Sequence, residues 1–139
     1  RLIAEYNPFL LDVEFNTIQK DKKLAVYLKK TKCKLLISWH DFKKTPNESQ
    51  LKSRFNKMKK FSNVVKIVTV AKNVSDASRL LSLYSIKSKN ETVAFCMGDQ
   101  GKFSRILCLH LGSPFTYVSL GKAIAPGQFS VDEIKSLEN

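Results

Sequence analysis

Lys66 and His40 are the residues whose types and surroundings most favour chemistry in this chain. Lys66 lies inside the β-branched run 64–70, and His40 directly follows the apolar run 35–39. Because burial among valines penalises a charged ammonium, the neutral, nucleophilic amine becomes accessible near neutral pH. An imidazole beside it is able to accept and return a proton in the same pH range. The pair predicts carbonyl chemistry in which the lysine is the nucleophile.

Apolar runs typical of strands alternate with segments of helical periodicity. We expect strands over 9–15, 35–39, 64–70, 92–96 and 115–119, and helices over 18–30, 46–61, 75–84 and 103–111 and from about residue 130 onward. Thr45 is expected to cap the helix that begins at Pro46. Strands joined by helices of this length require a parallel sheet with right-handed crossovers.

Glu14, His40 and Lys66 follow one another at intervals of 26 residues, so each occupies the same place in a repeating unit. Polar residues at successive strand ends then converge on one rim, which in a closed β/α barrel of the TIM type carries the active site. An open doubly wound sheet is the alternative. The glycine segment 98–103, however, has neither the spacing nor the Ser or Thr of a phosphate-binding loop.

Composition and charge limit the classes of partner. The 139 residues, of which 43% are apolar, fit one packed domain, and no apolar run approaches the length of a membrane span. The formal charge of +12 is concentrated between residues 20 and 60, but arginines and aromatics are not interleaved with these lysines. We therefore expect anionic ligands, and neither a nucleic acid nor a membrane as partner. Three widely spaced cysteines without a Cys-x-x-Cys pair predict no metal site and a reducing compartment, the cytoplasm.

Five motifs in succession carry a resemblance to a known family. They are Ile-Ser-Trp-His-Asp-Phe at 37–42 with Thr-Pro at 45–46, Val-Lys-Ile at 65–67, Met-Gly through Gly to Ser-Arg at 97–105, Gly-Ser with a following Thr at 112–116, and Ala-Pro-Gly-Gln at 125–128. In order and interval they resemble type I 3-dehydroquinate dehydratase. The resemblance implies a lyase of the shikimate pathway, built on a TIM-type barrel and free of cofactors, that dehydrates 3-dehydroquinate to 3-dehydroshikimate.

The resemblance also implies roles for individual residues. Lys66 matches the family's imine-forming lysine, and His40 matches the histidine that removes a proton from C2 and helps the C1 hydroxyl to leave. Arg105 matches the arginine that grips the substrate carboxylate, a task that suits a guanidinium fork. Gln128 matches the glutamine of the loop that closes over the substrate. Positions that line the pocket in the family are matched by Phe42, Met97 and Tyr117.

Two of these positions depart from the family pattern, and two acidic residues have a supporting role. Tyr117 replaces a more usual phenylalanine, and Ile124 stands where many relatives have a small hydroxyl residue that helps to hold the substrate. Asp12 and Glu14 are expected to support the rim by hydrogen bonding.

The resemblance predicts that part of the barrel lies outside this chain. Family members place about three further strands before the segment 12–14, so residues 1–128 correspond to strands four to eight. Residues 129–139 then form a C-terminal helix or lead into a following segment. We expect the missing N-terminal barrel segment to be the partner that activity requires, and the isolated chain to have little or no activity. The resemblance leaves open a homodimer and a fused shikimate dehydrogenase domain.

Two other functions stay open from the residues alone. One is another imine-forming barrel enzyme, such as a class I aldolase. The other is an inactive basic module that binds RNA or another anion.

Overall fold

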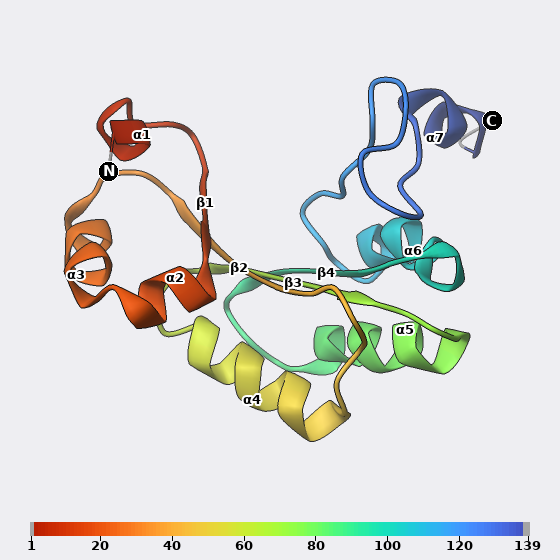
Figure 1. The fold of residues 1–139 in the computed structure, drawn as a ribbon, viewed down its shortest axis with the longest axis horizontal. Helices are drawn as coiled ribbons and strands as arrows, with labels where there is room; N and C mark the ends of the chain where they lie inside the picture. The colour runs from red at the N-terminus through yellow and green to blue at the C-terminus, as the bar shows by residue number, and fades with distance from the viewer. Residues whose placement is uncertain (1, 138–139) are drawn as a thin grey trace.

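A four-stranded parallel sheet forms the centre of the molecule. The computed structural model describes residues 2–137. The strands are β1 (Leu11–Glu14), β2 (Leu35–Asp41), β3 (Val64–Val70) and β4 (Glu91–Met97), and they are hydrogen-bonded in the order β1-β2-β3-β4. Each crossover between neighbouring strands contains at least one helix, as the alternating sequence pattern predicts (Figure 1).

The helices lie on both sides of this sheet. They are α1 (Leu2–Glu5), α2 (Phe15–Lys20), α3 (Lys22–Lys30), α4 (Glu48–Met58), α5 (Val74–Leu81), α6 (Ser104–His110) and α7 (Val131–Leu137), with short 3-10 helices η1 (Ser82–Ser85) and η2 (Asp99–Gly101). Figure 1 shows α4 and α5 below the sheet, whereas α6 and α7 lie above it near the end of β4. We call the face toward α4 and α5 the outer face, and the opposite one the inner face. Within the described residues no helix has the length and apolarity needed to cross a membrane.

The outer face carries the main apolar core. Side chains of successive residues alternate between the two faces of a strand, so every second residue points outward. Ile37 of β2, Val65 and Ile67 of β3 and Ala94 of β4 are fully buried, and they pack against a set of helical side chains. That set consists of Phe15, Ile18, Leu28, Leu51, Phe55, Met58, Ala77, Leu80 and Leu83. The apolar spacing of the helices is therefore explained by one continuous core.

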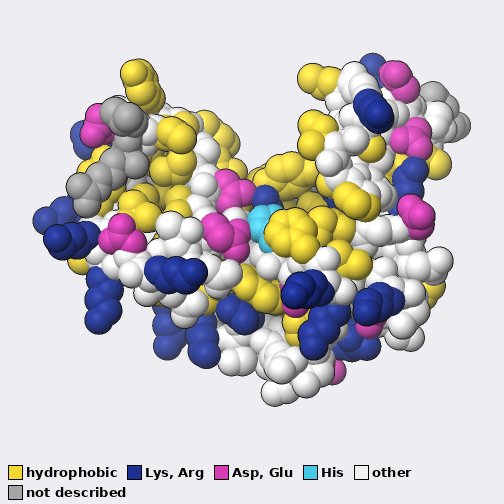
Figure 2. Space-filling model, viewed as in Figure 1, with side chains coloured by type: hydrophobic (Ala, Val, Ile, Leu, Met, Phe, Trp, Pro, Cys, Tyr) yellow, Lys and Arg dark blue, Asp and Glu magenta, His cyan; other side chains and the backbone are white. Residues whose placement is uncertain are grey.

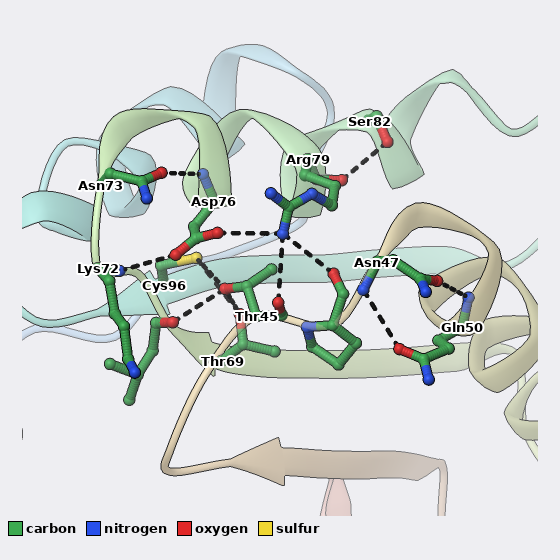
Figure 3. Close-up of polar contacts among 12 residues, drawn as sticks. Thr45, Asn47, Gln50, Thr69, Lys72, Asn73, Asp76, Arg79, Ser82 and Cys96 are labelled. Atoms are coloured by element: carbon green, nitrogen blue, oxygen red, sulfur yellow. Dashed lines mark hydrogen bonds and ion pairs between the residues drawn. The ribbon is translucent and has the colours of Figure 1, made fainter.

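Side-chain caps set the starts of the helices. Asn47, not Thr45, caps α4: its Oδ1 accepts from Gln50 N at 2.9 Å, and the Gln50 side chain accepts from Asn47 N at 3.3 Å. The prediction for Thr45 was wrong because its hydroxyl lies 2.7 Å from Thr69 Oγ1 and donates to Val70 O at 3.0 Å (Figure 3). The expected helix 18–30 is divided into α2 and α3 by Asp21, whose side chain caps α3 through Leu24 N.

The strand expected at 115–119 does not form, and this corrects the predicted count of five strands. Only Ser119 makes a bridge, and its partner is Ser130. Pro114 has no N–H to donate, and the carbonyl of Phe115 accepts from Ser113 Oγ at 2.8 Å. The segment therefore belongs to an irregular arm, residues 111–130, which we call the C-terminal arm; it rises above the inner face between α6 and α7 (Figure 1).

Candidate active site

The predicted site residues all line one cavity on the inner face. It has a volume of about 350 Å³ and lies over the carboxyl halves of β2, β3 and β4, beneath the C-terminal arm. Its lining consists of His40, Phe42, Lys66, Val68, Phe95, Met97, Arg105, Tyr117, Ile124, Ala125 and Gln128. Figure 2 shows the molecular surface hollowed between the N-terminal part and the C-terminal arm, with histidine, acidic and apolar side chains at the floor of the hollow.

Lys66 reaches this cavity from the middle of β3. Its side chain is 9% exposed, and Nζ donates to Asp12 Oδ2 at 2.7 Å. Nζ also lies 3.3 Å from the hydroxyl oxygen of Tyr117 and 4.5 Å from the centre of its ring. The sequence predicts the apolar neighbours of this amine, but the carboxylate and the phenol that hold it come from distant segments. The amine is thus fixed in position by two polar contacts.

His40 is oriented by Glu14. The two residues lie on adjacent strands, and His40 Nδ1 is 2.8 Å from Glu14 Oε2, which also accepts from Ser38 Oγ at 3.2 Å. An ionised carboxylate only accepts hydrogen bonds, so beside it a neutral imidazole places its proton on Nδ1 and presents Nε2 as an acceptor. The ring of Phe42 stacks on the imidazole, with centroids 5.7 Å apart and planes inclined by 11°. This arrangement suits a histidine that takes up protons through Nε2.

Arg105 is a buried cation with few partners. It is 2% exposed, its Nη2 donates to Pro126 O at 3.4 Å, and its Nε has no hydrogen-bond partner within the described residues. The guanidinium carbon lies 4.6 Å from the centre of the Phe95 ring. Burial lowers the pKa of Arg105 from its usual value. A bound anion would therefore satisfy both the charge and the free N–H.

The C-terminal arm is fastened to the turn after β4. Gly98 N donates to Pro126 O at 3.2 Å, and Gly127 has φ +70°, where a side chain is disfavoured. A Cβ at Gly127 would lie 2.6 Å from Gly98 O, so only glycine permits this approach. Gln128 Oε1 accepts from Ile124 N at 3.0 Å and from Ala125 N at 3.2 Å. The side chain of Gln128 thus closes the turn of the arm through its oxygen, and its amide N–H₂ takes no part in these two hydrogen bonds.

Asp12 and Glu14, which the sequence predicts to support the rim by hydrogen bonding, each contact one of the two proposed reacting residues. Their spacing of two residues places both on the inner face of β1, and the 26-residue interval from Glu14 to His40 indicates neighbouring strands. These two spacings indicate the face and the neighbouring strands, but they do not specify which residue each carboxylate contacts. In the part of the chain that the structure describes, no group of three potential metal ligands occurs.

The fold and the site define a class of protein: a parallel β/α layer with polar residues gathered at the carboxyl ends of its strands, as in β/α barrels. The family model of type I 3-dehydroquinase matches residues 1–138. The chain belongs to that family, which confirms the resemblance inferred from the motifs.

Individual relatives agree with this assignment. The chain is 42% identical over 132 residues to the 3-dehydroquinate dehydratase of Pyrobaculum aerophilum, covering 95% of this chain and 42% of that protein. A crystal structure of the type I 3-dehydroquinate dehydratase of Clostridium difficile with covalently modified comenic acid superposes with a TM-score of 0.83 at 27% identity; the match covers 98% of this chain and 56% of that one. A structure of dehydroquinate dehydratase and shikimate dehydrogenase from S. pombe gives a TM-score of 0.78 at 25% identity, covering 98% of this chain and 26% of that chain.

The chain spans about half the length of the curated relatives it matches, between 42% and 60% of the first ones. The four-stranded layer is therefore a part of the barrel fold of these neighbours, as the sequence predicts.

Proposed function

We propose that this chain supplies the imine-forming part of a type I 3-dehydroquinate dehydratase, which converts 3-dehydroquinate to 3-dehydroshikimate and water. The observation that carries this proposal is the common cavity of Lys66, His40 and Arg105: an amine, a proton acceptor and a buried cation face the same space. A keto acid requires these three groups for imine formation, proton removal and carboxylate binding.

In the proposed reaction the amine of Lys66 adds to the C3 ketone, and the ketone oxygen leaves as water to give a protonated imine. Asp12, 2.7 Å from Nζ, is the nearest acceptor for the proton that the ammonium must first release. The imine withdraws electrons from C2, and His40 takes the C2 proton through Nε2. The electron pair moves into the ring and expels the C1 hydroxyl, which receives the proton from His40 and leaves as water. Hydrolysis of the imine then frees the product and the amine.

The remaining cavity residues position the substrate in this proposal. Arg105 pairs with the carboxylate, which restores the hydrogen bonding that its Nε lacks. Gln128 donates from its amide N–H₂ to ring hydroxyls. Phe42, Met97 and Tyr117 form the walls, and Ile124 replaces a polar contact of the family by an apolar one.

We further propose that the activity needs a partner segment that completes the barrel. The relatives are about twice as long as the matched region, and the inner face here is covered only in part. The isolated chain is expected to form the imine but to turn over slowly or not at all. The same proposal includes a homodimer and a cytoplasmic location. It also includes a following shikimate dehydrogenase domain, as in the S. pombe neighbour.

Borohydride trapping tests the proposed function. Reduction of an imine of 3-dehydroquinate fixes the ligand on the lysine nitrogen, and peptide mapping by mass spectrometry then locates it. We expect the adduct on Lys66 alone and its complete loss in Lys66→Ala. Lys72→Ala, which removes an exposed lysine just beyond the same strand, is the matched control and should trap normally. An adduct on another lysine, or none in the unsubstituted chain, would contradict the proposal.

Two further measurements separate the alternatives. Trapping with sugar phosphates instead of 3-dehydroquinate would indicate an aldolase-like enzyme. Salt-sensitive RNA binding that persists in Lys66→Ala, without any trapping, would indicate a basic binding module. In the completed enzyme, His40→Ala should still form the adduct slowly but lose nearly all turnover.

A further inference from the structure

Tyr117 makes a polar contact with the reacting amine that an apolar wall residue would not make. Its hydroxyl oxygen is 3.3 Å from Lys66 Nζ. The ring is held by Phe95 and Phe115, whose ring centroids lie 5.9 Å and 5.7 Å away. Because the ring is packed on both neighbours, the position of the hydroxyl relative to the amine is set by the fold.

The hydrogen bonds that the Tyr117 hydroxyl can make differ before and after the amine reacts. An ammonium has three N–H donors, and in this structure Lys66 directs them to Asp12 and Tyr117 with one to spare. A protonated imine keeps a single N–H. The carboxylate of Asp12 holds that N–H more strongly than a neutral phenol does, because its hydrogen bond is charge-assisted. The Tyr117 hydroxyl is therefore released from the nitrogen in the step in which the ketone oxygen must depart.

We propose that the Tyr117 hydroxyl donates a hydrogen bond to the oxygen of the ketone that Lys66 attacks, and so assists formation of the imine. This inference rests on the proposed function and extends it to a residue that departs from the family pattern.

The step balances without any further reactant. The lone pair of the neutral amine forms the C–N bond, the C=O π pair moves to oxygen, and one proton passes from nitrogen to that oxygen. The C–O bond then breaks, and the oxygen leaves as water with a second proton, the one that the ammonium of Lys66 released to Asp12 before the attack. The nitrogen lone pair forms the C=N bond. Tyr117 keeps its own proton and only stabilises the negative charge that develops on oxygen.

Tyr117→Phe tests the proposal, because it keeps the ring and removes only the hydroxyl. Chain and 3-dehydroquinate are mixed, samples are reduced with borohydride at timed intervals, and the adduct is measured by intact mass. We expect adduct formation to slow about tenfold, since one hydrogen bond in the transition state corresponds to roughly 1.4 kcal/mol. The final yield and the thermal midpoint should match the unsubstituted chain. Tyr6→Phe, which removes an exposed hydroxyl, is the control and should change neither rate nor yield.

A second measurement distinguishes assistance at the ketone oxygen from a purely structural role of Tyr117. Imidazole buffer at constant pH should restore the rate of Tyr117→Phe as its concentration rises, because a dissolved acid replaces the missing donor, and it should leave the unsubstituted chain unaffected. A rate equal to that of the unsubstituted chain, or a slow rate that buffer does not restore, would overturn the role of Tyr117 while Lys66 still traps. Absence of any adduct in the unsubstituted chain would instead refute the proposed function itself.

Discussion

The two faces of the sheet are built from alternate residues of the same strands, yet they differ in almost every physical respect. On β3, Val65 and Ile67 of the outer face are fully buried in the apolar core. Lys66, which lies between them, points to the inner face and meets Asp12 and Tyr117. The outer face is closed by helices, whereas the inner face is hollowed, and its mostly apolar cavity contains the charged side chains of Lys66 and Arg105. A single strand can thus contribute both to the stabilising core and to the reactive site, because its successive side chains point to opposite faces of the sheet.

The largest expected effect of a substitution on stability lies on the outer side. Phe55 of α4 is fully buried in the core, and Phe55→Ala should lower the free energy of unfolding by about 3–5 kcal/mol because it leaves a cavity. Urea unfolding followed by circular dichroism measures this change. Leu120→Ala, at a side chain that is 98% exposed, is the control and should change it by less than about 0.5 kcal/mol. A small effect of Phe55→Ala would mean that the outer core is not the main source of stability.

The next effect concerns Tyr84, which packs against the outer core and against a second, smaller apolar cluster that includes Val93 and Phe95. Its hydroxyl bonds the backbone of Ala94. Burial raises the pKa of this phenol to about 12, whereas an unfolded tyrosine titrates near 10. Its contribution to stability is therefore complete below pH 10. It is lost as the pH rises toward 12, since the unfolded state ionises first.

Over this interval we expect Tyr84 to account for a loss of about 2–3 kcal/mol. Urea unfolding between pH 9 and pH 12 gives the dependence. Tyr84→Phe is less stable at neutral pH, but its stability should fall less steeply at high pH. Parallel curves for the two proteins would show that Tyr84 does not ionise differently on unfolding.

A smaller effect is expected at the inner face, where Glu14 orients His40. Glu14→Gln keeps the shape but removes the charge that favours a proton on Nδ1. We expect exchange of the C2 hydrogen of 3-dehydroquinate with deuterated solvent to slow about tenfold, corresponding to roughly 1.4 kcal/mol. NMR measures this exchange, and Glu5→Gln at an exposed position is the control. Unchanged exchange would exclude proton removal by a histidine that Glu14 orients.

The smallest effect on stability is expected for the residue with the greatest effect on chemistry. Lys66→Met replaces a buried ion pair by an apolar side chain, and Asp12 keeps contact with water, since its side chain is 39% exposed. We expect the free energy of unfolding to change by less than about 1 kcal/mol, because lost attraction and lost desolvation nearly cancel. A loss above about 3 kcal/mol in urea unfolding would show that the inner face also stabilises the fold.

The outer face was largely predictable from the sequence, because apolar patterns within single strands and helices determine it. Strand β3 has the bounds given by the apolar run 64–70, and Phe55 and Met58 lie at the helical spacing that predicts a buried stripe. The cavity residues were also placed together by the family motifs, although their individual roles stay predictions.

The remaining features depend on contacts between segments far apart in the sequence. From the sequence, the hydroxyl of Thr45 could cap α4 or bond a distant residue. In the structure it contacts Thr69 of a later strand and does not cap α4 (Figure 3). Arg79 of α5 also donates to Thr45 O at 3.2 Å and so holds the same loop. The apolar segment 115–119 has a strand-like composition, but without a ladder partner in the described structure it stays irregular. No local pattern reports the presence or absence of such a partner.

The order of the strands has a consequence for amide hydrogen exchange. β2 and β3 have neighbours on both sides, so nearly all their N–H groups are protected within ladders. In β1 and β4, which border the described sheet, alternate N–H groups point away from it and should exchange orders of magnitude faster. A strand that docked along either border would protect these same amides, so the exchange pattern would locate the point of attachment residue by residue.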